Sequence, residues 1–271
     1  MQAETVMDVE AYLARIGYQG TRGPDLQSLR CLHRAHMQTV PFENLDIVLG
    51  RPIVLSLPAI YQKVVSRGRG GFCYELNSLF GWLLQALGYK VSMLSARVYG
   101  SDGEPGPDFD HMLLLVEAEG LAICDVGFGE SFVEPLLLQQ DTPQQQGANR
   151  YRLCRDGDHW VYSSRRLQAE WQPQFRFPLT AQPLDAFFPM CHYNQTSPES
   201  SFTRKSVCSR AREDGRVTLS NGRLIRTING EREQQDVKDE TTYRQLLARH
   251  FSIDLGPDTS LENLLHGPPQ A

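Results

Sequence analysis

The spacing of apolar residues changes once along the chain, from a helical period before residue 90 to short strand-like runs after it. The first part contains four stretches in which apolar residues recur at every third or fourth position, which predicts amphipathic helices. The runs that follow are apolar or β-branched and are separated by turn residues, which predicts β-strands. A Rossmann-type fold requires strands and helices to alternate, so this order excludes one and predicts an α+β protein.

The predicted helices have recognisable starts and ends. They begin near Val9, Leu26, Ser56 and Cys73 and end before Gly17, Pro41, Gly68 and Gly88. The fourth has the strongest apolar face, formed by Leu76, Leu79, Phe80, Leu83, Leu84 and Leu87. We expect the four helices to pack together as a bundle within residues 1–90.

Residues 91–195 are predicted to form an antiparallel sheet or a small barrel. The strand-like runs are residues 91–99, 111–119, 121–129 and 151–164. The last run contains a hairpin turn at Asp156-Gly157, whereas the polar segment from Gln139 to Gln146 is expected to be a loop. Residues 196–271 contain a strand meander with two Asn-Gly turns and then an amphipathic helix, so they are predicted to be a third, mixed unit.

Charge and composition exclude several classes of partner. The chain of 271 residues carries 27 Lys and Arg against 32 Asp and Glu, a formal net charge of −5, with no block of basic residues. Nucleic acid and acidic membrane surfaces bind a cationic face, so neither is an expected partner. No apolar run approaches the ~18 residues of a membrane span. The N-terminal segment carries two acids before its first apolar stripe, unlike a signal peptide, so we expect a cytoplasmic globular protein.

The six cysteines are scattered along the chain, and none forms a C-x-x-C pair. A structural zinc site or a thioredoxin-type redox motif is therefore not expected, and no metal is assigned. The cytosol keeps thiols reduced, so a disulfide framework is not expected either. Five of the six are expected to be packing residues, and the question is whether one has reactive surroundings.

Cys73 follows a glycine-rich bend and stands at the start of the strongest predicted helix, in the segment RGRGGFCYELN. Unpaired N–H groups and the positive end of the helix dipole lie at such a position and favour a thiolate, so the pKa of Cys73 is expected to be lowered. The glycines would let a substrate carbonyl approach the backbone, where the Cys73 N–H could help to bind an oxyanion. The alternative is a buried cysteine at a helix start that serves only in packing.

His111 and Asp125 are the candidates for the base and the orienting acid that a nucleophilic cysteine needs. His111 begins a strand after a Gly- and Pro-rich loop, a position suited to face a cleft, and Asp125 lies in the next apolar strand. A buried carboxylate must be paired, and a hydrogen bond to His111 would satisfy it and fix the tautomer of the ring. Of the other histidines, His33 is expected at the core edge or the surface and His192 in an irregular segment.

A cysteine at a helix start, a histidine on a strand and an aspartate on the next strand resemble the arrangement in papain-like and transglutaminase-like enzymes. The segments RGGFCYELN, DHMLLLV and DVGFG further resemble the signature segments of the arylamine N-acetyltransferase family, bacterial type, and PFENLD and SPESSF resemble two more. This resemblance covers nearly the whole chain. It implies an α+β architecture with a cysteine-protease-like catalytic core, in which an N-terminal helical bundle (residues 1–90) is followed by a central antiparallel β-barrel (91–195) and a C-terminal α/β lid (196–271).

The resemblance also implies roles for single residues. Cys73 matches the nucleophile, His111 the base and Asp125 the orienting acid. The walls of the acceptor pocket match four further residues, namely Phe42, Val98, Phe128 and Phe202. The acyl donor would approach Gly127 and Gly129.

Two features depart from the family pattern. Phe72 and Tyr74 exchange the Tyr and the Phe that often flank the cysteine, which keeps the aromatic bulk. A Trp that some bacterial members place in the lid near the coenzyme has no counterpart in the segment VTLSNGRLIRT, so the coenzyme contacts of the C-terminal third are not carried over.

The implied reaction is a ping-pong transfer of an acetyl group. The Cys73 thiolate, paired with His111, would take the group from acetyl-CoA and pass it to an arylamine, a hydrazine or an N-hydroxyarylamine. Acetyl-CoA is then a co-substrate, and this chemistry requires no metal and no permanently bound cofactor. Two alternatives stay open: a thiol amidase or hydrolase that uses the same triad with water as acceptor, and an inactive ligand-binding homologue.

Overall fold

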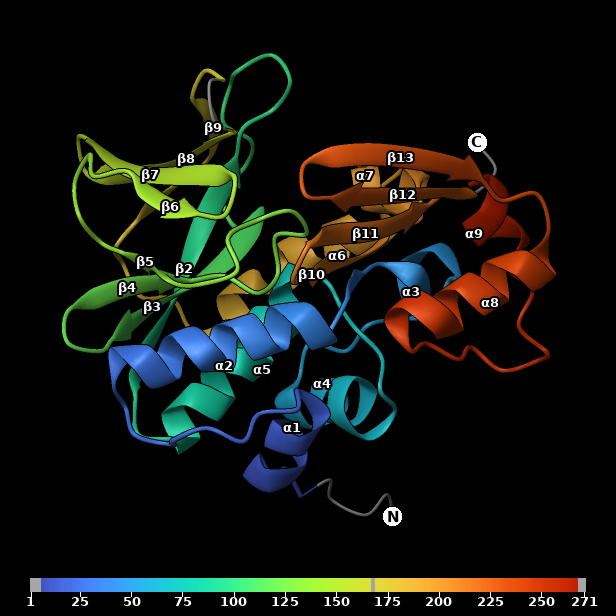
Figure 1. Ribbon diagram of the computed structural model, residues 1–271, viewed down its shortest axis with the longest axis horizontal. Coiled ribbons are helices and arrows are strands. Elements are labelled where there is room, and N and C mark those ends of the chain that lie inside the picture. The colour runs from blue at the N-terminus through green and yellow to red at the C-terminus, as the bar shows by residue number, and fades with distance from the viewer. Residues whose placement is uncertain (1–5, 167–168, 268–271) are drawn as a thin grey trace.

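The four predicted helices are all present in the computed structural model, which describes residues 6–166 and 169–267 (Figure 1). They are α1 (Val9–Arg15), α2 (Leu26–Thr39), α4 (Leu57–Tyr61), which continues as a π-helical turn at Gln62–Ser66, and α5 (Cys73–Ala86). The side chains of Asp8 and Asp25 accept backbone N–H groups at the starts of α1 and α2. These caps supply partners to N–H groups that have none within the helix, which explains where both helices begin.

The middle of the chain forms an eight-stranded antiparallel sheet that is nearly closed into a barrel (Figure 1). The strand order is β5-β4-β3-β2-β9-β8-β7-β6. The strands are β2 (Lys90–Val98), β3 (His111–Glu117), β4 (Leu121–Cys124), β5 (Leu136–Leu137), β6 (Gln144–Gln146), β7 (Asn149–Asp156), β8 (His159–Arg166) and β9 (Gln172–Pro178). Buried aromatic side chains such as Phe132, Tyr162 and Phe175 form its core. The predicted hairpin is confirmed, because β7 and β8 pair from Asp156 and His159 onwards.

The polar segment from Gln139 to Gln146 contains an edge strand of the barrel, so its prediction as a loop is wrong. Its last three residues form β6, which pairs with β7. The side chain of Gln144 accepts from the Leu137 N–H (2.8 Å) and donates to the Leu137 carbonyl (2.8 Å). It therefore makes the hydrogen bonds that the backbone of a neighbouring strand would make with the edge of β5. Gln146 bonds in the same way to the backbone just before β5. Side chains therefore close the barrel where backbone pairing stops.

The last part of the chain contributes four strands to a five-stranded antiparallel sheet in the order β1-β10-β11-β12-β13, and β1 comes from the first part. Its strands are β1 (Phe42–Glu43), β10 (Cys208–Arg212), β11 (Gly215–Ser220), β12 (Arg223–Ile228) and β13 (Glu231–Asp236). The turns Asn221-Gly222 and Asn229-Gly230 have positive φ at both residues, as two-residue hairpins require. The predicted meander is therefore confirmed, and the predicted amphipathic helix follows it as α8 (Glu240–Phe251).

Short helices connect these parts. They are α3 (Leu45–Val48), a 3₁₀ turn at Leu184–Phe187, α6 (Phe188–Thr196), α7 (Ser201–Arg204) and α9 (Glu262–His266). His192 lies within α6, so the segment predicted to be irregular is helical, and Pro189 in its first turn suits a helix start. Both β1 and α3 come from the PFENLD segment, and Leu45 and Val48 of α3 pack in the core of the last part. The first and last parts of the chain therefore share a sheet and a core.

Helix α5 packs against both the N-terminal helices and the barrel. It contacts α1 and α4 as well as the barrel strands β2 and β3. Five of the six residues of its apolar face are fully buried and Leu87 is partly buried, and each side chain of the size of Leu76 or Phe80 contributes about 1.5–3 kcal/mol on burial. Its polar residues Glu75 and Asn77 are buried as well. The predicted α+β fold of helices and an antiparallel barrel is confirmed, and its polar interior lies at the start of α5.

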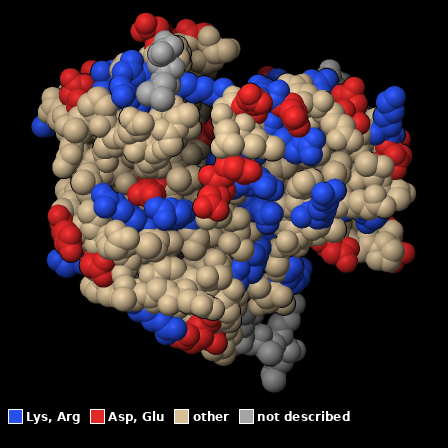
Figure 2. Space-filling view, viewed as in Figure 1, with Lys and Arg blue, Asp and Glu red and all other residues tan. Residues whose placement is uncertain are grey.

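The charged side chains are spread over the surface. Figure 2 shows basic and acidic groups interspersed on one face, with uncharged residues between them. Exposed ion pairs such as Arg97–Asp108 and Lys90–Glu117 contribute at most about 1 kcal/mol each. Within the described ranges, every helix is too short or too polar to cross a membrane.

We predict that Gln144→Ala and Gln146→Ala each lower the free energy of unfolding by about 1–3 kcal/mol, because each leaves backbone groups at the barrel edge without partners. Gln145→Ala is the matched control, since this neighbouring side chain is exposed, and a change within about 0.5 kcal/mol is expected. Chemical denaturation of the three variants measures the difference. Equal losses in all three would contradict closure of the barrel by glutamine side chains.

Candidate active site

Cys73 is the first residue of α5, as the sequence predicts. Phe72 precedes it as the N-cap residue, and the Phe72 N–H donates to Oε2 of Glu75 (3.2 Å). In the turn before it, a Cβ on Gly70 would stand 2.0 Å from the carbonyl oxygen of Pro41, so no other residue fits there without moving the backbone. The glycine-rich bend therefore packs against the segment that leads into β1 and brings the thiol to that junction.

The Cys73 thiol is almost fully buried, with 3% of the residue exposed. Burial raises the pKa of Cys73 well above its ordinary value, the backbone amide of Met112 opposes the shift, and the carboxylates of Asp110 and Asp125 add to it. The pKa of Cys73 is therefore raised where the sequence predicts that the helix start lowers it, because burial disfavours the charged thiolate. A thiolate at this position requires a neighbouring group that accepts the proton.

His111 and Asp125 form a buried pair, with 2.8 Å between His111 Nε2 and Asp125 Oδ2. His111 begins β3 and Asp125 follows β4, and these two strands pair as predicted. Asp125 Oδ1 accepts two more bonds, from Asn77 Nδ2 (3.0 Å) and the Gly127 N–H (2.9 Å). Burial by itself would raise the pKa of Asp125, but the charge of His111 and these hydrogen bonds hold it below its ordinary value. An ionised Asp125 binds the Nε2 proton and leaves Nδ1 of His111 as the basic nitrogen.

Asn77 joins the cysteine helix to both strands. Besides its bond to Asp125, its Nδ2 donates to the Met112 carbonyl (2.6 Å), and its Oδ1 accepts from the Val126 N–H (2.9 Å). Asn77 lies one helical turn after Cys73, so the two side chains share a face of α5. That spacing is the only signal of this role in the sequence, and it was not enough to predict the role.

The two glycines of DVGFG lie against the cysteine and the candidate pocket. A Cβ on Gly127 would stand 2.6 Å from Cys73 Cα, so a larger residue would displace the start of α5. Gly129 has a φ of 80°, and its Cβ would lie 3.5 Å from the ring of Phe42. Close packing on Cys73 is therefore one physical reason for glycine at position 127.

His33 reaches the same site from α2. It is fully buried, so its prediction as a core-edge or surface residue is wrong. Its Nε2 accepts from the Asp125 N–H (3.1 Å), and its Nδ1 lies 2.9 Å from the Val133 carbonyl. Burial lowers the pKa of His33 to about 4, so the ring is neutral and carries its proton on Nδ1. Both partners are far away in the sequence, so the local pattern holds no sign of them.

Two of the candidate pocket residues, Val98 and Phe128, belong to the barrel. The ring of Phe128 lies 5.0 Å from the His111 ring, edge to face. Val98 is paired across the sheet with Phe175, whose ring lies 5.1 Å from Phe128 and 5.2 Å from His111. His111 therefore packs against an apolar wall that contains the rings of Phe128 and Phe175.

The other two, Phe42 and Phe202, come from β1 and α7. Their ring centroids are 6.2 Å apart, and Phe202 also lies 5.8 Å from Phe72, the residue before Cys73. Both are partly buried against the apolar core that contains Cys73. Since Phe42 also packs on Gly129, this second wall meets the barrel at the turn that follows β4.

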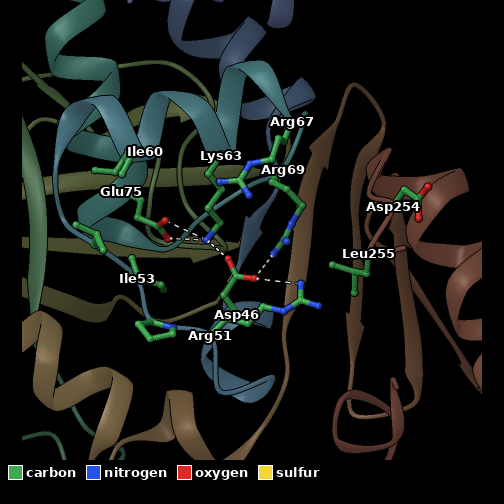
Figure 3. Close-up of a pocket in the computed structure, with 13 residues that line it drawn as sticks. Asp46, Arg51, Ile53, Ile60, Lys63, Arg67, Arg69, Glu75, Asp254 and Leu255 are labelled. Atoms are coloured by element: carbon green, nitrogen blue, oxygen red, sulfur yellow. Dashed lines mark hydrogen bonds and ion pairs between the residues drawn. The ribbon is translucent and has the colours of Figure 1, made fainter. Parts of the chain in front are cut away.

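A cavity of about 420 Å³ lies at the same helix start but is lined by other residues (Figure 3). Charged side chains from the PFENLD segment, the π-helical turn and α5 surround it, and they point towards one another. Glu75 pairs with Lys63 (3.0 Å), Lys63 with Asp46 (2.9 Å), Asp46 with Arg69 (3.1 Å), and Arg69 with Glu43 (2.8 Å). Burial raises the pKa of Glu75, and the charge of Lys63 opposes that shift. Because Glu75 also accepts the N–H of the N-cap residue, this network fixes the first turn of α5.

No group of three or more His, Cys, Asp or Glu side chains within residues 6–166 and 169–267 could hold a metal ion. The six cysteines, all of which lie in these ranges, are free thiols. The fold and these side chains define a class of protein: a buried cysteine begins the central helix and a His–Asp pair lies on adjoining strands, as in cysteine-protease-like cores. The N-acetyltransferase family model matches residues 25–260.

Known proteins narrow this class to one family. An arylamine N-acetyltransferase of Mycolicibacterium smegmatis is 35% identical over 257 residues, which cover 92% of this chain and 93% of the relative. An arylamine N-acetyltransferase / N-hydroxyarylamine O-acetyltransferase of Salmonella typhimurium is 35% identical over 249 residues, which cover 90% of this chain and 88% of the relative. The structure of Mycobacterium marinum arylamine N-acetyltransferase in complex with CoA has a TM-score of 0.85, at 33% identity over 91% of this chain and 93% of that one. The chain belongs to the arylamine N-acetyltransferase family.

Lys63→Met is predicted to lower the free energy of unfolding by about 3–5 kcal/mol, because it leaves the buried charges of Glu75 and Asp46 without this partner. Chemical denaturation measures the loss. The double variant Lys63→Met/Glu75→Gln should recover part of it, since it also removes one of the unpaired charges. A double variant that is no more stable than Lys63→Met would contradict this account of the network.

His33 is predicted to make stability depend on pH between its ordinary pKa of 6.5 and about 4. In this window the unfolded chain binds a proton on His33 and the folded protein does not, so stability falls as the pH falls. His33→Gln should remove up to about 1.4 kcal/mol per pH unit from the slope. Unfolding free energies of wild type and variant across this window test the prediction, and identical slopes would contradict it.

Proposed function

We propose that Cys73, His111 and Asp125 are the catalytic triad of this arylamine N-acetyltransferase. The observation that carries the proposal is the buried hydrogen bond between His111 and Asp125, which binds the Nε2 proton and reserves Nδ1 for the proton of the thiol. Acetyl-CoA is the acyl donor, and the acceptor is an arylamine, a hydrazine or an N-hydroxyarylamine. The names of the relatives support both substrates, since they specify arylamine and N-hydroxyarylamine transfer and, for the Mycobacterium marinum protein, a complex with CoA.

In the first half-reaction His111 Nδ1 takes the proton of the Cys73 thiol, and the sulfur attacks the thioester carbonyl of acetyl-CoA. The bond between the acyl carbon and the CoA sulfur breaks, and CoA leaves with the proton from His111. Because burial raises the pKa of Cys73, the ion pair with His111 supplies the thiolate that the apolar site disfavours. The Cys73 N–H at the helix start is a donor for the oxyanion of this step.

In the second half-reaction the nitrogen of an arylamine or hydrazine, or the hydroxyl oxygen of an N-hydroxyarylamine, attacks the S-acetyl carbon, and His111 removes the proton of that atom as the Cys73 sulfur leaves. Phe42, Val98, Phe128 and Phe202 are proposed to line the acceptor pocket. A flat aromatic ring would stack on these walls, at about 0.5–1.5 kcal/mol beyond its burial. A weakly basic arylamine is uncharged at neutral pH, so it enters an apolar pocket with little desolvation, unlike a protonated alkylamine.

Two glycines mark the proposed approach of the acyl donor. Gly127 and Gly129 flank the turn after β4, and neither places a side chain between this turn and the cysteine. The donor thioester would pass this turn to reach Cys73.

Three units are proposed, with a helical bundle at residues 1–90, a β-barrel at 91–195 and an α/β lid at 196–271. The start of β2 at Lys90 and the end of α6 at Thr196 support these boundaries. The lid is attached to the bundle through the pairing of β1 with β10. The proposed lid would therefore be held on the bundle by a sheet as well as by the connecting chain.

A cytoplasmic location and small-molecule partners complete the proposal. The six cysteines are free thiols, a state that the reducing cytosol maintains. The formal net charge is −5, and the face in Figure 2 mixes charges of both signs, whereas nucleic-acid binding requires a cationic surface.

Incubation of the protein with acetyl-CoA alone should add the mass of one acetyl group, and peptide mapping should place it on Cys73. Cys73→Ala should gain no mass. His111→Gln should slow the formation of the adduct by about 10²–10⁴-fold, because the general base is lost. The exposed His266 provides the control, since His266→Gln should react as wild type does.

An adduct that is absent, or that maps to another cysteine, would contradict the proposed function. The hydrolase alternative is tested by following the hydrolysis of an anilide beside the CoA-dependent acetylation of an aniline. The transferase should acetylate the aniline and leave the anilide intact.

A further inference from the structure

Tyr74 directly follows Cys73 in α5, and its hydroxyl connects three separate segments of the chain. It donates to the Phe109 carbonyl (2.7 Å), lies 3.2 Å from the next carbonyl, and accepts from Asn194 Nδ2 (3.1 Å). Tyr74 is fully buried, and Asn194 is 3% exposed. Phe72, on the other side of the cysteine, has no hydroxyl, so these bonds depend on the order in which the two aromatic residues flank Cys73.

The carbonyls that Tyr74 contacts belong to the two residues immediately before His111. Phe109 has a φ of 63°, a left-handed conformation that a bulky residue adopts only where its surroundings hold it. The Tyr74 hydroxyl stabilises this conformation, because it donates a hydrogen bond to the carbonyl of Phe109 itself. This bond therefore holds the backbone two residues before His111, where β3 begins.

The same hydroxyl is connected to α7, which carries Phe202. Asn194 Oδ1 accepts from Ser200 Oγ (2.9 Å), and Ser200 Oγ accepts from the Phe202 N–H (3.2 Å). Each hydroxyl in this chain both accepts and donates, so all the donors point from Phe202 towards Phe109. Hydrogen bonds aligned in this way polarise and strengthen one another.

We propose that Tyr74 is a positioning residue that aligns His111 with Cys73 and holds Phe202 in the acceptor pocket. This inference rests on the proposed function, which assigns the base and the pocket. The hydroxyl of Tyr74 contacts none of the reacting atoms, so it acts through the segments that it joins. A phenylalanine at this position would keep the ring packing but would leave a buried carbonyl and a buried amide without this partner.

Tyr89 provides a matched control for Tyr74→Phe. It follows the other end of α5, about 20 Å away along the helix axis. It is 3% exposed, and its hydroxyl also donates to two backbone carbonyls, those of Gly23 and Asp25 (2.9 Å each). Tyr89→Phe therefore removes the same kind of hydrogen bond at a place that touches neither His111 nor the pocket.

The measurement is the single-turnover rate at which acetyl-CoA acetylates Cys73, together with kcat and KM for an arylamine. Tyr74→Phe should slow acetylation about tenfold and raise the acceptor KM about threefold, because His111 and Phe202 both lose their alignment. Tyr89→Phe should keep the wild-type rate and KM while its melting temperature falls by a similar amount. A role in stability alone would move the melting temperatures and not the rates.

Asn194→Leu separates the two ends of the network. It removes the bonds to Tyr74 and Ser200 but keeps the bond from Tyr74 to Phe109, so it should raise the acceptor KM and slow acetylation much less than Tyr74→Phe does. If Tyr74→Phe does not fold, Asn194→Leu provides the test of the positioning role. An unchanged acceptor KM in Asn194→Leu overturns the inference.

Equal acetylation rates in Tyr74→Phe and Tyr89→Phe would also overturn the inference, while normal acetylation of Cys73 in the wild type would leave the proposed function standing. A wild-type protein that forms no acetyl-Cys73 would contradict the proposed function itself, and the inference with it.

Discussion

The buried carboxylate of Asp125 is the constraint on which the rest of the structure depends. It accepts hydrogen bonds from His111 on β3, Asn77 on α5 and Gly127, and its own N–H donates to His33 on α2. An ionised group with no exposed surface is tolerated only when its oxygens are paired. Satisfying this one carboxylate therefore brings α5, the start of β3 and the turn after β4 together, and the backbone N–H of Asp125 adds α2 through His33.

A second buried carboxylate, Glu75, acts on the other side of the cysteine. It accepts the N-cap N–H of α5 and pairs with Lys63, so the first turn of the helix is held by charge as well as by packing. Between these two carboxylates Cys73 lies in an apolar environment that raises its pKa. Burial at this point disfavours the charged thiolate, and in the proposed function His111 takes the proton of the thiol.

Much of the architecture could be predicted from the sequence, because its signals are local. The caps at Asp8 and Asp25, the Asn-Gly turns and the apolar face of α5 act within a few residues of where they stand. The predicted pairing of the strands that carry His111 and Asp125 also rests on a short turn between them. The predictions failed where a distant partner overrides the local pattern, as for His33, which is buried against Asp125 and Val133.

The sequence by itself determined the order of elements, the helix start at Cys73 and the family to which the segments around it are similar. Only the tertiary structure decided the protonation of these groups and the partners of their neighbours. Burial raises the pKa of the Cys73 thiol, and the bonds of Asn77, His33 and Tyr74 reach residues tens of positions away. Desolvation and long-range hydrogen bonds depend on what the folded chain brings together, and no local pattern of residues contains that information.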